Sequence, residues 1–150
     1  NFFKNNKKLN CLFDMPIHES GQFKLKHKST NYSIWQTIFP TSCISIRRNF
    51  FISFLENINK NNYSSLEIDA RLHIFSKFYM NEGHILNRKI TRYNYDQNGI
   101  TSSIRKFSKI WWIRRSEAFS YLKIIMKKKR LTFVPSLDYY LTSLLTFMIK

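Results

Sequence analysis

Two acidic side chains stand two residues apart in the segment Leu66–Ala70. A carboxylate placed at the start of a helix can act as a general base and remove the proton of an attacking hydroxyl group. On a helix Glu67 and Asp69 project about 200° apart, so the two carboxylates cannot share one task. The alternative is structural, because acids in the first turn of a helix stabilise it through the helix dipole.

Hydroxyl groups in the segment Pro40–Ile46 offer a second candidate site. Small polar and aliphatic residues alternate there, which predicts a short strand. At the start of this strand the hydroxyl groups of Thr41 and Ser42 are available for hydrogen bonds to a ligand. The alternative is that both side chains are simply solvated at the entry of the strand.

A third candidate site combines two tryptophans with two arginines on one predicted helix. Trp111 and Trp112 are suited to stacking on a sugar or a lipid, or else they belong to the hydrophobic core. Arg114 and Arg115 are suited to a diphosphate, whose oxygens match the bidentate geometry of a guanidinium group. The competing interpretation is a surface ion pair between Arg114 and Glu117, one helical turn apart.

Four consecutive basic residues end the same predicted helix. Each basic residue close to an anionic membrane surface contributes about 1 kcal/mol to binding. We therefore expect binding to the surface of a membrane, with the apolar face of the following helix taking part. The alternative is a solvated helix end, where cations are favoured by the dipole. The four residues are Lys127, Lys128, Lys129 and Arg130.

The composition is that of one folded domain. The chain has 150 residues, of which 43% are hydrophobic and 17% aromatic, enough for a packed core. Only 3 Gly and 3 Pro are present, so long helices are favoured over sharp turns. The 2 Cys and 4 His lack the spacing of metal ligands, which predicts reduced thiols and no metal site. No apolar stretch reaches the ~18 residues that a membrane span requires.

The elements that must position these side chains include both strands and helices. We expect short strands near Leu12, Ile44 and Ile90, and a polar surface loop from Glu19 to Asn31. A turn at Asn98-Gly99 ends the last of these strands.

Four helices are predicted from the periodicity of apolar residues. The first runs from Arg48 to Asn59, and the second begins at a cap, Ser64 or Ser65, and ends near Gly83. The third runs from Ser103 to Lys129 and the fourth starts at Pro135-Ser136. The apolar stripes are Ile68, Leu72, Phe75 and Tyr79 in the second helix, Phe107, Trp111, Ala118, Leu122 and Ile125 in the third, and Leu137, Tyr140, Leu141, Leu144, Leu145 and Met148 in the fourth.

The net charge of +16, from 25 basic and 9 acidic residues, favours a polyanionic partner. Basic and aromatic side chains together would suit a nucleic acid. However, no helix-turn-helix, RNP, KH or zinc pattern occurs, and the basic residues are spread over the whole chain. An interaction module without catalysis is a further alternative.

Three segments in this order resemble the C-terminal half of family 2 glycosyltransferases, which build bacterial surface polysaccharides. They are Ile38–Arg48 (IFPTSCISIRR), Leu66–Leu72 (LEIDARL) and Ser108–Ala118 (SKIWWIRRSEA). The resemblance covers roughly Leu9 to Lys129. It implies a helix-rich α/β fold: the C-terminal half of a GT-A catalytic domain over residues 1–102 and a helical extension, associated with a membrane surface, over residues 103–150.

The resemblance implies an inverting transfer of a sugar from a nucleotide-sugar donor to a glycan or lipid-linked acceptor. By position Asp69 would be the general base and Glu67 the second candidate, with Thr41 and Ser42 beneath the acceptor. Family members hold a divalent metal, Mg or Mn, through a DxD motif that this chain lacks, together with the nucleotide-binding strand before it. We therefore expect the acceptor-side piece of a longer enzyme, inactive by itself, in the cytoplasm or at the inner face of the cell membrane.

Overall fold

The structure, a computed structural model, is a mixed α/β fold rich in helix, as the sequence predicts. The loop predicted from Glu19 to Asn31 and the turn predicted at Asn98-Gly99 lie outside the residues that it describes. It describes residues 2–18, 39–58, 63–81, 83–86, 88, 90–93 and 104–149.

A three-stranded sheet forms one layer, with the strand order β3-β1-β4. The central strand β1 (Cys11–Asp14) pairs antiparallel with β3 (Ile44–Ile46) and parallel with β4 (His84–Leu86). All four residues of β1 are buried, because the strand has a partner at both edges and packs against the helices. The strands predicted near Leu12 and Ile44 are therefore confirmed.

A second pair of strands extends the structure beyond the end of β1. Strand β2 (Ile17–His18) is parallel to β5 (Arg92–Tyr93), two residues beyond the strand centre predicted at Ile90. The buried carboxylate of Asp14, at the end of β1, accepts a hydrogen bond from the backbone N–H of Thr91 at 2.9 Å. This bond connects the three-stranded sheet to the pair of β2 and β5.

The segment that begins at Pro40 is only in part a strand, which corrects the prediction. Residues Thr41–Cys43 form a 3-10 turn, η1, and only the three residues of β3 are extended. The N–H of Cys43 donates to the carbonyl of Pro40 at 2.8 Å, and this bond closes the turn. Thr41 and Ser42 therefore lie on an exposed turn and not within the sheet.

Helix α2 (Arg48–Asn57) agrees with its prediction to within two residues, whereas the next helix begins later than predicted. Helix α3 (Ile68–Ile74) has Glu67 at its N-cap position and continues as the π-helix η2 (Phe75–Met80). The predicted caps Ser64 and Ser65 precede the helix, because both donate hydrogen bonds to Glu117 instead.

Gly83 does not end this helix, contrary to the prediction. The helix stops at Met80, and Asn81 adopts the left-handed conformation with φ 54°. Gly83 begins the approach to β4 with φ 138°, where an added Cβ would come within 3.2 Å of the ring of Phe13 and 3.3 Å of Ser76 Oγ. The glycine is thus required for close packing.

Helix α5 (Lys109–Lys128) starts later than predicted, since Ser108 caps it by accepting a hydrogen bond from the N–H of Trp111 at 3.3 Å. Phe107 therefore lies outside the helix and is 72% exposed. The buried tryptophan is Trp112, whereas the predicted stripe contained Trp111, which is half-buried. The prediction of Phe107 as the first member of the stripe is also wrong. Its other members, Ala118, Leu122 and Ile125, are buried as predicted.

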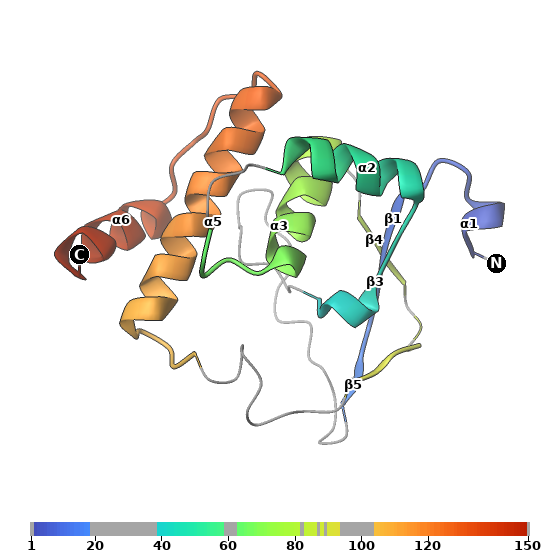
Figure 1. Cartoon of the computed structure of the whole chain (residues 1–150), viewed down its shortest axis with the longest axis horizontal. Helices are drawn as coiled ribbons and strands as arrows, with labels where there is room; N and C mark the ends of the chain where they lie inside the picture. Colours follow the sequence, from blue (N-terminus) through green and yellow to red (C-terminus); the bar gives the residue numbers. More distant parts are fainter. Residues whose placement is uncertain are drawn as a thin grey trace.

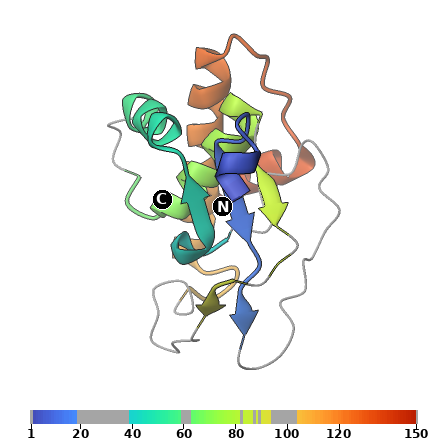
Figure 2. The ribbon, with the colours of Figure 1, turned by 90° about the vertical axis from the view of Figure 1, so that its right-hand side faces the viewer.

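The elements form successive layers. Helix α3 lies between the sheet and α5, and helix α6 (Leu137–Ile149) packs on α5 on the side away from the sheet (Figure 1). Figure 2 shows the strands side by side in front of α3. One hydrophobic core runs through these layers and includes residues from both sides of residue 102.

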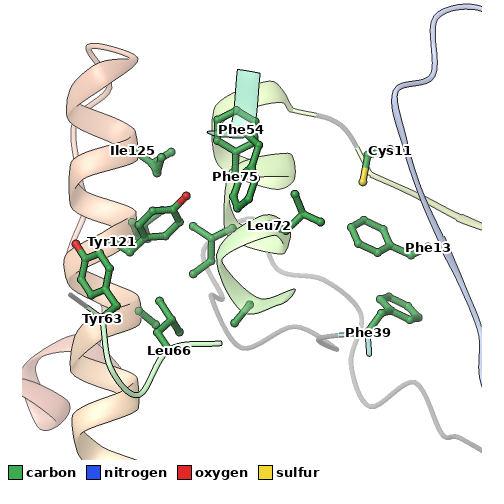
Figure 3. Packing of buried hydrophobic residues seen from close by; sticks show 14 of the residues in the cluster. Cys11, Phe13, Phe39, Phe54, Tyr63, Leu66, Leu72, Phe75, Tyr121 and Ile125 are labelled. Carbon is green, nitrogen blue, oxygen red and sulfur yellow. The ribbon is translucent and has the colours of Figure 1, made fainter. Parts of the chain in front are cut away.

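The core is built around α3 and η2. On the sheet side, the ring of Phe13 stacks on that of Phe39 at 5.3 Å (Figure 3). On the α5 side, Tyr63 meets Tyr121 edge to face at 5.7 Å (Figure 3). Phe75 is fully buried between the two (Figure 3).

Candidate functional site

The two candidate carboxylates lie at the start of α3, as the sequence predicts. Asp69 is in the first turn, and its Oδ1 accepts a hydrogen bond from the N–H of Ala70 at 2.7 Å. Burial raises the pKa of the Asp69 carboxyl above its usual range, although the Ala70 hydrogen bond and the charge of Arg114 oppose the shift. A carboxyl with a raised pKa is better matched to proton abstraction near neutral pH than an ordinary one.

Glu67 has a different environment, because it is engaged with α5. Its Oε2 lies 2.7 Å from the Nε of Arg114, and both side chains are largely buried, at 22% and 15% exposed. Such a pair is costly to break, because the remaining charge would be left without a partner in a poorly solvated place. The predicted surface pair between Arg114 and Glu117 is therefore replaced by an ion pair with Glu67.

Glu117 instead holds the segment that leads into α3. Its Oε2 accepts a hydrogen bond from the N–H of Ser65 at 2.9 Å, and its Oε1 accepts one from the hydroxyl of Ser64 at 3.4 Å. Together with the pair of Glu67 and Arg114, these bonds fix the start of α3 on the N-terminal half of α5. The Asp69 backbone is therefore set by contacts that are far apart in the sequence.

A cleft of about 480 Å³ opens between this segment and the start of α5. Its volume lies in the range of small-ligand sites. Glu67 is the candidate carboxylate that lines it, whereas Asp69 does not. The guanidinium of Arg71 also lines the cleft, where its Nε donates to the carbonyl of Leu66 at 2.9 Å. Other lining residues are Tyr63, Ser64, Ile104 and Ile110.

Sequence reasoning did not single out Arg71 or His73. Arg71 lies four residues after Glu67, and His73 lies four residues after Asp69, so each shares a helix face with a candidate carboxylate. This spacing was the only signal in the sequence. His73 is buried, and neither of its ring nitrogens has a hydrogen-bond partner among the residues that the structure describes. Burial, helped by the charge of Lys77, lowers the pKa of His73 to about 4.

Thr41 and Ser42 are connected to α3 through aromatic packing. The ring of His73 lies 5.2 Å from that of Phe13, which stacks on Phe39, two residues before Thr41. Asp69 is one turn before His73, whose ring meets β1, but the charged group that acts on Asp69 is Arg114 of α5. The turn is held in place by the hydroxyl of Thr91, which donates to the carbonyl of Ser42 at 3.3 Å.

The tryptophans and Arg115 form a separate cluster, on the side of α5 that meets α6. Trp111 and Trp112 contact each other edge to face at 4.5 Å. The guanidinium of Arg115 lies 4.5 Å from the centre of the Trp111 ring, and its Nη2 donates to both carboxylate oxygens of Asp138. Arg115 is thus used to hold α6, and no local spacing in the sequence indicates this partner.

The basic run lies at the opposite end of α5. Sixteen residues separate Trp111 from Lys127, which corresponds to about 24 Å along a helix. Lys128 donates to the carbonyl of Asn57 at 3.1 Å, and the ammonium of Lys129 lies 4.7 Å from the centre of the Tyr79 ring. All four basic side chains are exposed. The structure therefore separates the candidate carboxylates from the candidate membrane contact.

Comparison of the chain with protein-family models, curated proteins and solved structures gives no match. Among the residues that the structure describes, no helix combines the length and apolar character needed to cross a membrane. Over the same residues, no three side chains of His, Cys, Asp or Glu gather in an arrangement that could hold a metal ion.

Proposed function

We propose that the chain is the acceptor-side part of a GT-A-type glycosyltransferase, which transfers a sugar from a nucleotide-sugar donor to a glycan or lipid-linked acceptor in surface polysaccharide synthesis. In this proposal the donor and its divalent metal are bound by residues that precede the present 150. Asp69 removes the proton of the acceptor hydroxyl as that oxygen attacks the anomeric carbon. Glu67 is the second candidate for this role.

The observation that carries the proposal is the environment of Asp69. This carboxyl is in the first turn of α3, on the helix face that carries His73, and burial raises its pKa. Structural acids at helix starts are usually well solvated, and interaction with the helix dipole favours their charged form. A raised pKa is instead a frequent property of catalytic carboxyls.

The cleft beside Glu67 would hold the acceptor in the version of the proposal in which Glu67 is the base, because Glu67 lines the cleft and Asp69 does not. Its lining combines the polar side chains of Ser64, Glu67 and Arg71 with the apolar side chains of Ile104 and Ile110. Sugar rings present both kinds of surface, so such a cleft suits one or two sugar units. The exposed hydroxyls of Thr41 and Ser42 are an alternative acceptor contact on the other side of α3.

The test is sugar transfer by the product of the full coding sequence that contains these residues, assayed with a panel of nucleotide sugars. Asp69→Asn should reduce turnover by about 10²- to 10⁴-fold, the usual contribution of a general base. Glu56→Gln, on the exposed face of α2, is the matched control and should leave turnover unchanged. The activity of the unsubstituted enzyme should fall with decreasing pH at a value above the usual carboxyl range.

Two outcomes would contradict the proposal. Unchanged turnover in Asp69→Asn, with a large loss in Glu67→Gln at unchanged thermal stability, would transfer the role of base to Glu67. No transfer from any nucleotide sugar, with the complete product folded, would overturn the glycosyltransferase assignment itself.

A further inference from the structure

Helix α6 packs on the rest of the chain with its polar side. Thr142 and Thr146 are buried, at 1% and 6% exposed, and face α5. The hydroxyl of Thr146 donates to the carbonyl of Trp112 at 3.4 Å, and Asp138 forms its ion pair with Arg115. Asp138 is the only charged residue between Leu137 and Ile149, so the one charge of this helix and two of its threonines are directed to α5.

The apolar side of α6 faces outward, at the edge of the molecule remote from the sheet (Figure 1). Leu137 is 86% exposed, Phe147 81% and Met148 71%. The spacing of the exposed residues places them on one stripe opposite the two threonines. The stripe consists of Leu137, Tyr140, Leu141, Leu144, Phe147 and Met148, and the Tyr140 hydroxyl is its one polar side-chain group.

The C-terminal end of α5 and the connection to α6 expose positive charge and further apolar side chains. Lys127 and Arg130 are exposed at the end of α5. Leu131 and Val134, in the connection, are 52% and 63% exposed. A small apolar pocket of about 110 Å³ lies under the connection, next to Val134. Basic and large apolar side chains exposed together are the pattern of segments that lie in the interface of an anionic bilayer.

We infer that the outer face of α6 and the basic end of α5 form a docking surface for an anionic lipid bilayer. A second copy of the chain is the less suitable occupant, because two chains that each carry a net charge of +16 repel each other. Negatively charged lipid headgroups offset that same charge. The apolar side chains of the stripe, such as Leu144 and Phe147, insert into the acyl region of the bilayer. The inference does not rest on the glycosyltransferase proposal, since it requires no sugar transfer.

The test is co-sedimentation of the chain with phosphatidylcholine vesicles that contain or lack phosphatidylglycerol, at low and at physiological salt. We expect binding to the anionic vesicles, weakened by salt. The double variant Leu144→Glu and Phe147→Glu should lower the partition coefficient by more than tenfold. Leu55→Glu, at a residue of α2 that is 48% exposed, should leave it unchanged.

The charge contribution is tested with two matched pairs of substitutions. Lys127→Gln with Arg130→Gln should weaken binding roughly 30-fold, on the scale of about 1 kcal/mol for each basic residue at the surface. Lys7→Gln with Lys8→Gln removes the same charge from exposed positions elsewhere and should have a much smaller effect. Circular dichroism of each variant shows that the fold is retained.

A probe at position 147 reports contact directly. Phe147→Cys labelled with an environment-sensitive dye should shift its emission to the blue on anionic vesicles, whereas Ile52→Cys should not. The native Cys11 and Cys43 are both fully buried and should not react.

Three results would overturn the inference. They are the absence of binding to anionic vesicles at low salt, binding that the glutamate substitutions leave unchanged, and a stable dimer in solution that these substitutions dissociate. The last would show that a second copy covers the face.

Discussion

Helices α3 and α6 both carry a clear apolar stripe in the sequence, yet the structure uses the two stripes in opposite ways. In α3 and its continuation η2, Leu72 and Phe75 of the predicted stripe are buried between the sheet and α5, whereas Ile68, at the start of the helix, is 47% exposed, contrary to the prediction. In α6 the apolar stripe is exposed, and the contact with the protein is made by Thr142 and Thr146, the carboxylate of Asp138 and the ring of Tyr139. The comparison teaches that an amphipathic pattern predicts a helix and a face, but not which surface the face will meet.

The largest effect should come from the same substitution made in both regions. Phe75→Ala should cost about 3–5 kcal/mol of the free energy of unfolding, because it leaves a cavity in the packed core. Phe147→Ala should change it by less than about 0.5 kcal/mol, since the side chain is 81% exposed. Urea denaturation measures both. Similar costs at the two positions would show that α6 is buried more deeply than described.

The next effect concerns the buried histidine of α3. The pKa of His73 is lowered from 6.5 to about 4, so the unfolded chain binds a proton more readily than the folded one between these pH values. Stability should therefore be complete above pH 6.5 and fall by roughly 3 kcal/mol as the pH decreases to 4. His73→Leu should remove this contribution. His84→Gln, at an exposed position, should retain it.

The smallest effect concerns the attachment of α6. Asp138→Asn removes the charge that holds Arg115 and should cost about 1 kcal/mol, because the pair is only partly buried. Hydrogen exchange should then become faster in α6 and stay unchanged in α3. Equal changes in both helices would show that the molecule opens as one unit, and the contrast between the two regions would be lost.

Much of the candidate site depends on contacts that the sequence does not reveal. The position of Asp69 in a first helical turn was predictable, since it follows from local periodicity. Its raised pKa was not, because burial depends on how α3 packs between the sheet and α5. The partners of Arg114 and Arg115 were also unpredictable: Glu67 and Asp138 lie 47 and 23 residues away in the chain. Local spacing had favoured Glu117 for Arg114.

The sequence by itself determined the helix-rich α/β class, the central strand around Leu12 and most members of the helix stripes, because these follow from propensity and from periods of two and 3.6 residues. The tertiary structure alone decided that Trp112 rather than Trp111 is buried, that His73 has no partner among the described residues, and that the stripe of α6 faces outward. The physical reason is that a helix stripe is fixed by neighbours within one turn. The environment of the stripe is fixed by segments that are distant in the sequence. In α6, the hydroxyl of Thr146 and the carboxylate of Asp138 bind to α5, so the opposite side of the helix faces outward.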